Sequence, residues 1–283
     1  MKKIALTSLI AMFAFAGAHA ANVIDGNPLY MPKKGHFYSV TDVSSHTDKY
    51  VNGDKQINTW KLGEEFGYGV TDKFAVQLST ALSENDTFKQ AQWGDLELSG
   101  VYRALDKGAW KLDVFGAYDV SPLWNHPKPN GQDAWFDKDL TEYVWSAGVR
   151  GGYTTAKWTV AGHAMFSYWN DESFNWNEGA GKAGIHALTL GLDGQYVIDS
   201  NWNVTAGVEY TGILDDEYRK TPGTTIKNAG TWEGTFGVNY NIDATKFVGA
   251  YISGSMNHQG GTNNDEWKAD DGFGFGAKFG IDF

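Results

Sequence analysis

The sequence contains no cysteine among its 283 residues and only six prolines. Without thiols the protein can form no disulfide bond, no thiolate metal site and no lipid anchor on cysteine. Basic residues are also scarce, because 23 Lys and Arg stand against 34 Asp and Glu and leave a formal net charge of −11. So acidic a chain is a poor candidate for binding nucleic acid, whose phosphates attract positive charge.

Long apolar runs are missing beyond the first twenty residues, although a membrane-spanning helix needs about 20 consecutive apolar residues. Together with the mean hydropathy of −0.40, this excludes a helical membrane protein. At the start, Lys2 and Lys3 precede an uncharged apolar run at 4–17 and a small-x-small sequence at 18–20. This pattern is typical of a secretory signal peptide, cleaved near Ala20.

The alternation of apolar residues at every second position is the main positive signal. Since successive side chains of a strand point to opposite faces, such a segment has one apolar and one polar face. Clear strands are predicted at 60–70, 74–78, 96–102, 110–118, 143–153, 158–168, 188–198, 202–210, 232–242 and 273–283. Two weaker strands are predicted at 36–43 and 247–256. In the second of these, one face carries Val248, Ala250 and Ile252 and the other carries Phe247 and Tyr251.

The predicted connections alternate between short and long. Short turns are expected at 71–73, 105–109, 154–157, 199–201 and 243–246, and long polar segments at 45–56, 83–92, 121–140, 170–184, 215–230 and 257–271. These connections join twelve strands and put both chain ends on the short-turn side. The arrangement is typical of transmembrane β-barrels, which combine short turns at one end with long loops at the other.

Aromatic residues make up 15% of the chain and gather at the predicted strand ends. One set brackets the short turns and comprises Tyr68, Phe74, Tyr102, Trp110, Tyr153, Trp158, Tyr196, Trp202, Tyr240, Phe247 and Phe283. A second set lies near the long segments and comprises Trp60, Trp93, Tyr118, Tyr143, Tyr168, Trp169, Tyr210, Trp232 and Phe273. Two sets predict two aromatic girdles at the membrane surfaces. The alternative, a soluble β-sandwich, would leave a large apolar surface without a partner.

The signal peptide, the alternating turns and the closing Phe-Gly-Ile-Asp-Phe at 279–283 resemble Gram-negative outer-membrane β-barrel proteins of the porin or small-channel type. The stretch 68–74 is similar to a periplasmic hairpin of transporter-like barrels. The expected fold is all-β, a single closed antiparallel transmembrane β-barrel of twelve strands with short periplasmic turns and long extracellular loops. Its parts are a signal peptide at 1–20, a periplasmic N-terminal lead at 21–35 and the barrel at 36–283.

The resemblance also implies partners. Outer-membrane lipid and lipopolysaccharide would surround the barrel, and the barrel assembly machinery would read the terminal aromatic and the alternate apolar residues before it. The matching residues here are Phe275, Phe279, Ile281 and Phe283.

The polar face of the predicted strands is expected to line the lumen. Its charged and titratable residues are Lys61, Glu65, Asp95, Glu97, Arg103, Asp113, Asp119, Glu142, Arg150, His163, Asp193, Glu209 and Glu233. Because carboxylates outnumber bases on this face, the lining should favour cations. Twelve strands lie between filled and open barrels. Ion pairs of Arg103 or Arg150 with Glu97 or Glu142 could therefore bridge the lumen and close it.

Two local features are each compatible with two structures. The segment 121–140 could fold into the barrel mouth as a constriction, or it could be an ordinary exposed loop; its candidate constriction residues are Trp124, His126, Trp135 and Phe136. Glu64 falls on the apolar face, where a carboxylate is costly in a membrane. A β-bulge at Gly63 or Gly67 would turn Glu64 inward beside Glu65.

We expect a channel for passive passage of small hydrophilic solutes, either cations or neutral molecules such as sugars. A structural or adhesive barrel with a closed lumen is the first alternative. A hydrolase built on His163 with Ser146 or Ser167 is the second, but the sequence holds no nucleophile elbow and no His-Glu-x-x-His motif. We therefore predict no enzymatic activity, no cofactor and no metal site.

Overall fold

The structure is a computed structural model that describes residues 26–49, 56–85, 91–122, 141–171, 184–214, 218–221, 224–261 and 271–283. The predicted signal peptide and the four candidate constriction residues lie outside this part of the chain. The strands are β1 (Phe37–Lys49), β2 (Gln56–Thr71), β3 (Phe74–Asn85), β4 (Ala91–Lys107), β5 (Trp110–Pro122), β6 (Thr141–Thr154), β7 (Trp158–Asp171), β8 (Gly184–Val197), β9 (Trp202–Ile213), β10 (Tyr218–Thr221), β11 (Thr224–Asn241), β12 (Lys246–Gly261) and β13 (Asp271–Asp282).

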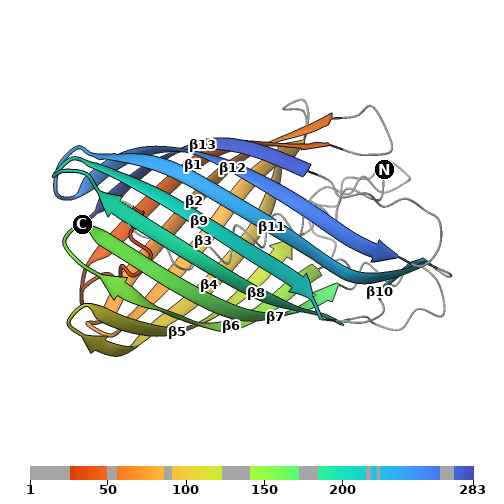
Figure 1. Cartoon of the computed structure of the whole chain (residues 1–283), viewed down its shortest axis with the longest axis horizontal. Helices are drawn as coiled ribbons and strands as arrows, with labels where there is room; N and C mark the ends of the chain where they lie inside the picture. The colour runs from red at the N-terminus through yellow and green to blue at the C-terminus, as the bar shows by residue number, and fades with distance from the viewer. Residues whose placement is uncertain are drawn as a thin grey trace.

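Twelve of these strands form a closed antiparallel ring (Figure 1). Neighbouring strands pair from β1 to β9 and from β11 to β13, while β1 pairs with β13 and β9 pairs with β11 to complete the circle. The four-residue β10 pairs only with the start of β11 and lies outside the ring. The all-β fold and the number of barrel strands predicted from the sequence are therefore confirmed. Among the described residues, no helix has the length and apolar character to cross a membrane.

The two faces of the ring differ in polarity as the alternation predicts. On β4, for example, the side chains of Leu98 and Tyr102 are 58% and 50% exposed on the outer face. Glu97, Ser99 and Arg103, which alternate with them, are buried on the inner face. Such an apolar outer surface requires an apolar environment, since monomeric soluble proteins rarely expose large continuous apolar areas.

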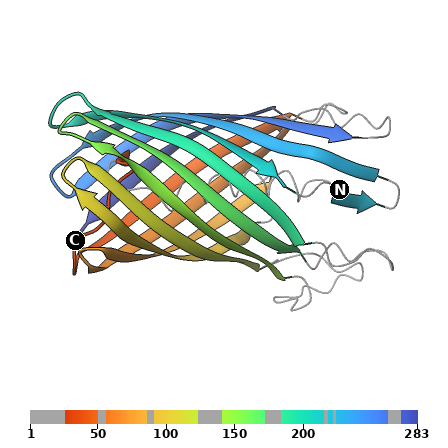
Figure 2. The ribbon, with the colours of Figure 1, turned by 60° about the horizontal axis from the view of Figure 1, so that its bottom comes forward.

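The short turns lie together at the end of the barrel that carries the C-terminus (Figures 1 and 2). Turn chemistry explains their positions, because Asp and Thr side chains bind nearby backbone amides there. In the β11–β12 turn, Asp243 Oδ1 accepts hydrogen bonds from the amide and the hydroxyl of Thr245 at 2.8 and 2.9 Å. The amide of Thr245 and then its hydroxyl hold the pKa of Asp243 below its ordinary value.

Two aromatic residues assigned to the outer girdles lie on the inner face instead. Phe247 is only 2% exposed, and Trp169 is 8% exposed. On β12 the outer positions belong to Val248 and Ile252, which settles the ambiguous face of this strand. The ring of Phe247 fits because a Cβ added to Gly280 would lie 2.1 Å from it, so a glycine opposite makes room for an inward aromatic side chain.

Glu64 stays on the outer face, and the predicted bulge is absent. The pairing of β1 with β2 runs without a shift from Phe37 opposite Tyr68 to Lys49 opposite Gln56. Glu64 instead accepts hydrogen bonds from the hydroxyls of Ser39 at 2.5 Å and Thr41 at 2.6 Å. Two neighbouring hydroxyls thus replace the inward turn as the means of stabilising this carboxylate.

Candidate functional site

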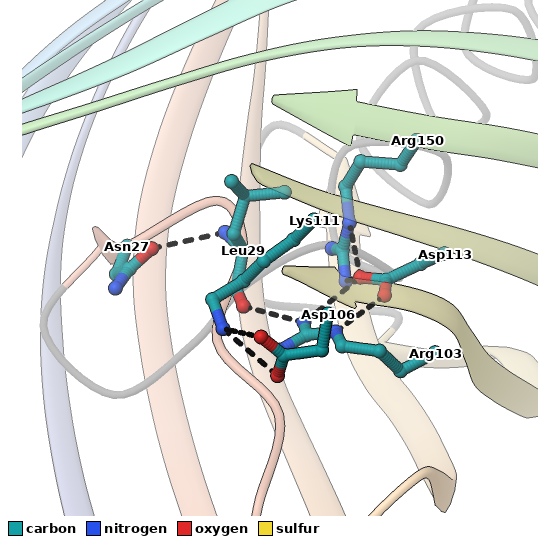
Figure 3. A network of polar contacts seen from close by, with 7 residues as sticks. All are labelled: Asn27, Leu29, Arg103, Asp106, Lys111, Asp113 and Arg150. Carbon is teal, nitrogen blue, oxygen red and sulfur yellow. Dashed lines mark hydrogen bonds and ion pairs between the residues drawn. The ribbon is translucent and has the colours of Figure 1, made fainter. Parts of the chain in front are cut away.

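The inner face carries a cluster of buried ion pairs on three neighbouring strands (Figure 3). Arg103 on β4 donates from Nε to Asp113 Oδ1 at 2.7 Å, and Arg150 on β6 donates from Nη2 to Asp113 Oδ2 at 2.7 Å. Asp113 on β5 is 0% exposed. The register explains the cluster, since Asp113 is directly opposite Arg103 on one side and Arg150 on the other.

This cluster differs from the predicted one. The expected ion pairs joined the two arginines to Glu97 or Glu142 across the lumen, whereas both arginines bind Asp113 along one wall. Two guanidinium groups share one carboxylate, so this part of the wall keeps positive charge. Burial of such a group requires paired charges and complete hydrogen bonding, because an unpaired buried ion is strongly destabilising.

A second cluster lies further along the same wall. His163 on β7 contacts Asp193 Oδ2 through Nδ1 at 3.2 Å and Glu209 Oε2 through Nε2 at 3.1 Å. Room for the imidazole comes from Gly191 on β8, because a Cβ added there would lie 2.1 Å from the ring. Both ring nitrogens therefore face carboxylates. This arrangement holds a histidine between two carboxylates.

The two clusters belong to one row of directly paired inner positions. In order from β4 to β11 the row is Arg103, Asp113, Arg150, His163, Gly191, Glu209 and Glu233. We call it the charged row. Its two arginines, on β4 and β6, share Asp113 between them and leave a net positive charge there, whereas its two glutamates lie on β9 and β11.

A third network occupies the inner face of β1 to β4. The hydroxyl of Tyr38 donates to Glu65 at 2.6 Å and accepts from Gln77 Nε2 at 2.6 Å. Nearby, the hydroxyl of Tyr251 donates to Asp42 Oδ1 at 3.0 Å. Tyr38, Asp42 and Tyr251 were not among the predicted lumen residues, because β1 and β12 carry apolar residues on both faces. Only the even spacing of Tyr38 and Asp42 could have indicated a shared face.

The structure gives the place of eleven of the thirteen predicted lumen residues. Those that are buried on the inner face are Glu97, Arg103, Asp113, Asp119, Arg150, His163 and Glu209, and those that are partly buried there are Lys61, Glu65, Asp193 and Glu233. Asp95 lies in β4 and Glu142 in β6, but their side chains lie outside the described part of the structure. The residues of the hydrolase alternative are also placed. Ser146 and Ser167 pair opposite each other on β6 and β7, at positions four residues from Arg150 and His163.

The described part of the N-terminal lead, from residue 26 on, enters the barrel, which the sequence did not indicate. Leu29 is 2% exposed, and its carbonyl oxygen accepts a hydrogen bond from Arg103 Nη2 at 2.7 Å (Figure 3). The side chain of Asn27 accepts a hydrogen bond from the amide of Leu29 at 3.0 Å and so shapes this stretch. No periodic pattern marks these residues, so sequence reasoning placed 21–35 only as a periplasmic lead.

The described ranges contain no group of three or more His, Cys, Asp or Glu side chains arranged to hold a metal ion. His186, another histidine of the strands, lies on the outer face. Its ring centroid is 5.8 Å from that of Phe166 and 5.1 Å from that of Tyr168. It therefore belongs to the aromatic exterior of the barrel.

Comparison with known proteins identifies similar barrels but no family. No protein-family model matches the sequence, and no curated protein matches it. An outer membrane channel from Pseudomonas putida F1 is similar in structure, with a TM-score of 0.57, 15% identity and coverage of 93% of this chain and 100% of the other.

Two further solved structures have the same architecture. The NanC porin gives a TM-score of 0.52 at 12% identity, covering 84% of this chain and 98% of its own. The translocator domain of the autotransporter NalP from Neisseria meningitidis gives 0.56 at 10% identity, covering 97% and 96%. At these identities the likeness concerns the fold, which is that of outer-membrane β-barrels.

Proposed function

We propose that this protein is an outer-membrane channel for the passive passage of small hydrophilic solutes. The observation that carries the proposal is a closed twelve-stranded ring with a charged inner face and an apolar outer face. A closed ring leaves no unpaired strand edge, so its backbone can cross hydrocarbon without unsatisfied hydrogen bonds. The Pseudomonas protein described as a channel and the NanC porin support the same role.

The outer surface supports placement in the outer membrane. Large apolar side chains such as Leu98, Trp145 and Ile252 are more than half exposed on it, at 58%, 55% and 51%. Delivery by a signal peptide cleaved near Ala20, contact with lipopolysaccharide and insertion by the barrel assembly machinery complete the proposal. Phe275, Phe279, Ile281 and Phe283 would carry the assembly signal.

The charge of the inner face favours cations or neutral solutes over anions. Carboxylates on this face include Asp42, Glu65, Glu97, Asp113, Asp119, Asp193, Glu209 and Glu233, whereas the bases include Lys61, Arg103, Lys111, Arg150 and Lys278. An excess of lining carboxylates raises the local concentration of cations and repels anions. Neutral sugars would pass without an electrostatic barrier.

Planar-bilayer recording tests this function. Purified protein should give discrete conductance steps, and a potassium chloride gradient should give a reversal potential of the sign expected for potassium preference. Liposome swelling in small sugars tests neutral solutes. Silent bilayers together with sugar-impermeable liposomes, at high protein load, would reject the channel.

One observation favours the alternative of a structural or adhesive barrel with a closed lumen. Residues 26–32 lie inside the turn end, where Pro28 and Leu29 are buried. The two functions make opposite predictions for conductance, so the same recordings decide between them.

A further inference from the structure

We infer that residues 26–32, which we call the strap, cross the turn end of the lumen and determine which solutes pass. This inference rests on the proposed channel function. Figures 1 and 2 show the red N-terminal segment within the barrel near the C-terminus. The strap therefore lies in the conducting path and not outside the barrel.

The two ends of a short stretch of the strap touch different walls. A Cβ added to Gly26 would lie 2.5 Å from Thr205 Cγ2 on β9 and 3.0 Å from Asn239 Nδ2 on β11. Three residues later, Leu29 is hydrogen-bonded to Arg103 on β4. The strands β5 to β8 separate β4 from β9 around the ring. The chain therefore crosses the interior between these walls, over a span of at most about 11 Å for three residues.

The strap is seated on a matching apolar patch. Met31 packs against Val101, Phe115 and Met165, which are buried on the inner faces of β4, β5 and β7. Apolar side chains on an otherwise polar lumen wall would be exposed to water if the strap left. Their burial therefore holds the strap in place through the hydrophobic effect.

A different set of contacts anchors the residues that follow the strap. The amide of Gly35 donates to the carbonyl of Gly69 at 2.7 Å, and the amide of Gly69 donates to the carbonyl of His36 at 2.9 Å. The amide of Lys34 donates to Asp72 at 3.3 Å. Since this anchor is independent of Leu29 and Met31, the strap can leave the lumen while β1 stays paired.

The sequence of contacts defines a latch and a hinge. The latch is the hydrogen bond between Arg103 and the Leu29 carbonyl together with the packing of Met31. The hinge lies just before the anchored residues, which include Gly35 with a φ of +81° that favours glycine. Displacement of the strap would open the turn end without breaking any strand pairing of the barrel.

Two variants test the strap in the full-length protein. The first lacks residues 26–32 and should show a larger unitary conductance and pass larger sugars than the parent. The second is Met31→Ser, which weakens the apolar seat and should increase the time spent in the larger-conductance state. Lys34→Ser is the matched control, because Lys34 is exposed and anchored through its backbone; it should behave as the parent. Heat-modified mobility in gels verifies that each barrel is folded.

The outcomes separate the strap from the channel. If the parent conducts and the deletion variant has the same conductance and sugar cut-off, the inference about the strap is overturned. The proposed channel function is then unaffected. If the parent is silent and the deletion variant conducts, the result supports the inference and shows that the strap blocks the lumen completely. If parent and deletion are both silent, the channel function is rejected and the strap inference is rejected with it. If the deletion variant fails to fold, Met31→Ser provides the test. Equal conductance of Met31→Ser and the parent would then overturn the inference about the strap.

Discussion

Arg150 and Asp113 lie directly opposite each other on β6 and β5, joined by a 2.7 Å hydrogen bond between Nη2 and Oδ2. Asp113 also binds Arg103, so its removal would leave two buried guanidinium groups without their shared carboxylate. We expect Asp113→Asn to lower the free energy of unfolding by about 3–5 kcal/mol. Urea titration in lipid vesicles, followed by tryptophan fluorescence, measures this change.

Asp106→Asn is the matched control for this prediction. It removes the 3.0 Å ion pair between Asp106 on β4 and Lys111 on β5, but the Asp106 side chain is 46% exposed. An exposed pair contributes below about 1 kcal/mol. Equal losses in the two variants would contradict the importance of burial at Asp113.

Ion selectivity should depend on which face a carboxylate occupies. Glu97 is 7% exposed on the inner face, whereas Glu64 lies on the outer face. We expect Glu97→Gln to move the reversal potential in a potassium chloride gradient toward zero, because one lining negative charge is lost. Glu64→Gln removes the same charge outside and should leave the reversal potential unchanged. A shift of equal size in both variants would count against selectivity by lining charge.

The outer carboxylate should depend on its two hydroxyl partners. Ser39→Ala with Thr41→Val removes both hydrogen bonds to Glu64 and should lower stability by about 1–3 kcal/mol, the range for a polar group left unsatisfied. In a Glu64→Leu background the same two substitutions should change the free energy of unfolding little, since no carboxylate remains. A double-mutant cycle of unfolding free energies measures the coupling. Identical losses in both backgrounds would show that the hydroxyls act independently of Glu64.

Inward aromatic side chains should need the glycines beside them. At Gly280 an added Cβ would lie 2.1 Å from the Phe247 ring, so Gly280→Ala should cost about 1–3 kcal/mol through overpacking. Gly254→Ala is the control, because the nearest atom to its added Cβ is a backbone oxygen at 3.7 Å. Unfolding titrations should separate the two variants. If Phe247→Leu restored no stability to Gly280→Ala, a ring clash would not be the cause.

The sequence alone determined the twelve barrel strands, the order of short and long connections and the polarity of most faces, but not the four-residue β10, which lies within the predicted long segment 215–230. These features are local: side chains alternate with period two, and turn residues such as Asp243 act within their own turn. Where the alternation was weak, in β1 and β12, the prediction failed to identify Asp42 and Tyr251 as inner residues. For aromatic residues at strand ends, the sequence pattern did not distinguish a side chain of the outer girdle from one on the inner face, as Trp169 shows.

Only the tertiary structure decided which residues meet. The pairing of β1 with β13 and of β9 with β11, and the register around the ring, place Asp113 between Arg103 and Arg150. The entry of Leu29 into the lumen was likewise invisible in the sequence, because its contact with Arg103 joins residues 74 positions apart. Such contacts depend on closure of the whole sheet, which no local pattern of residues encodes.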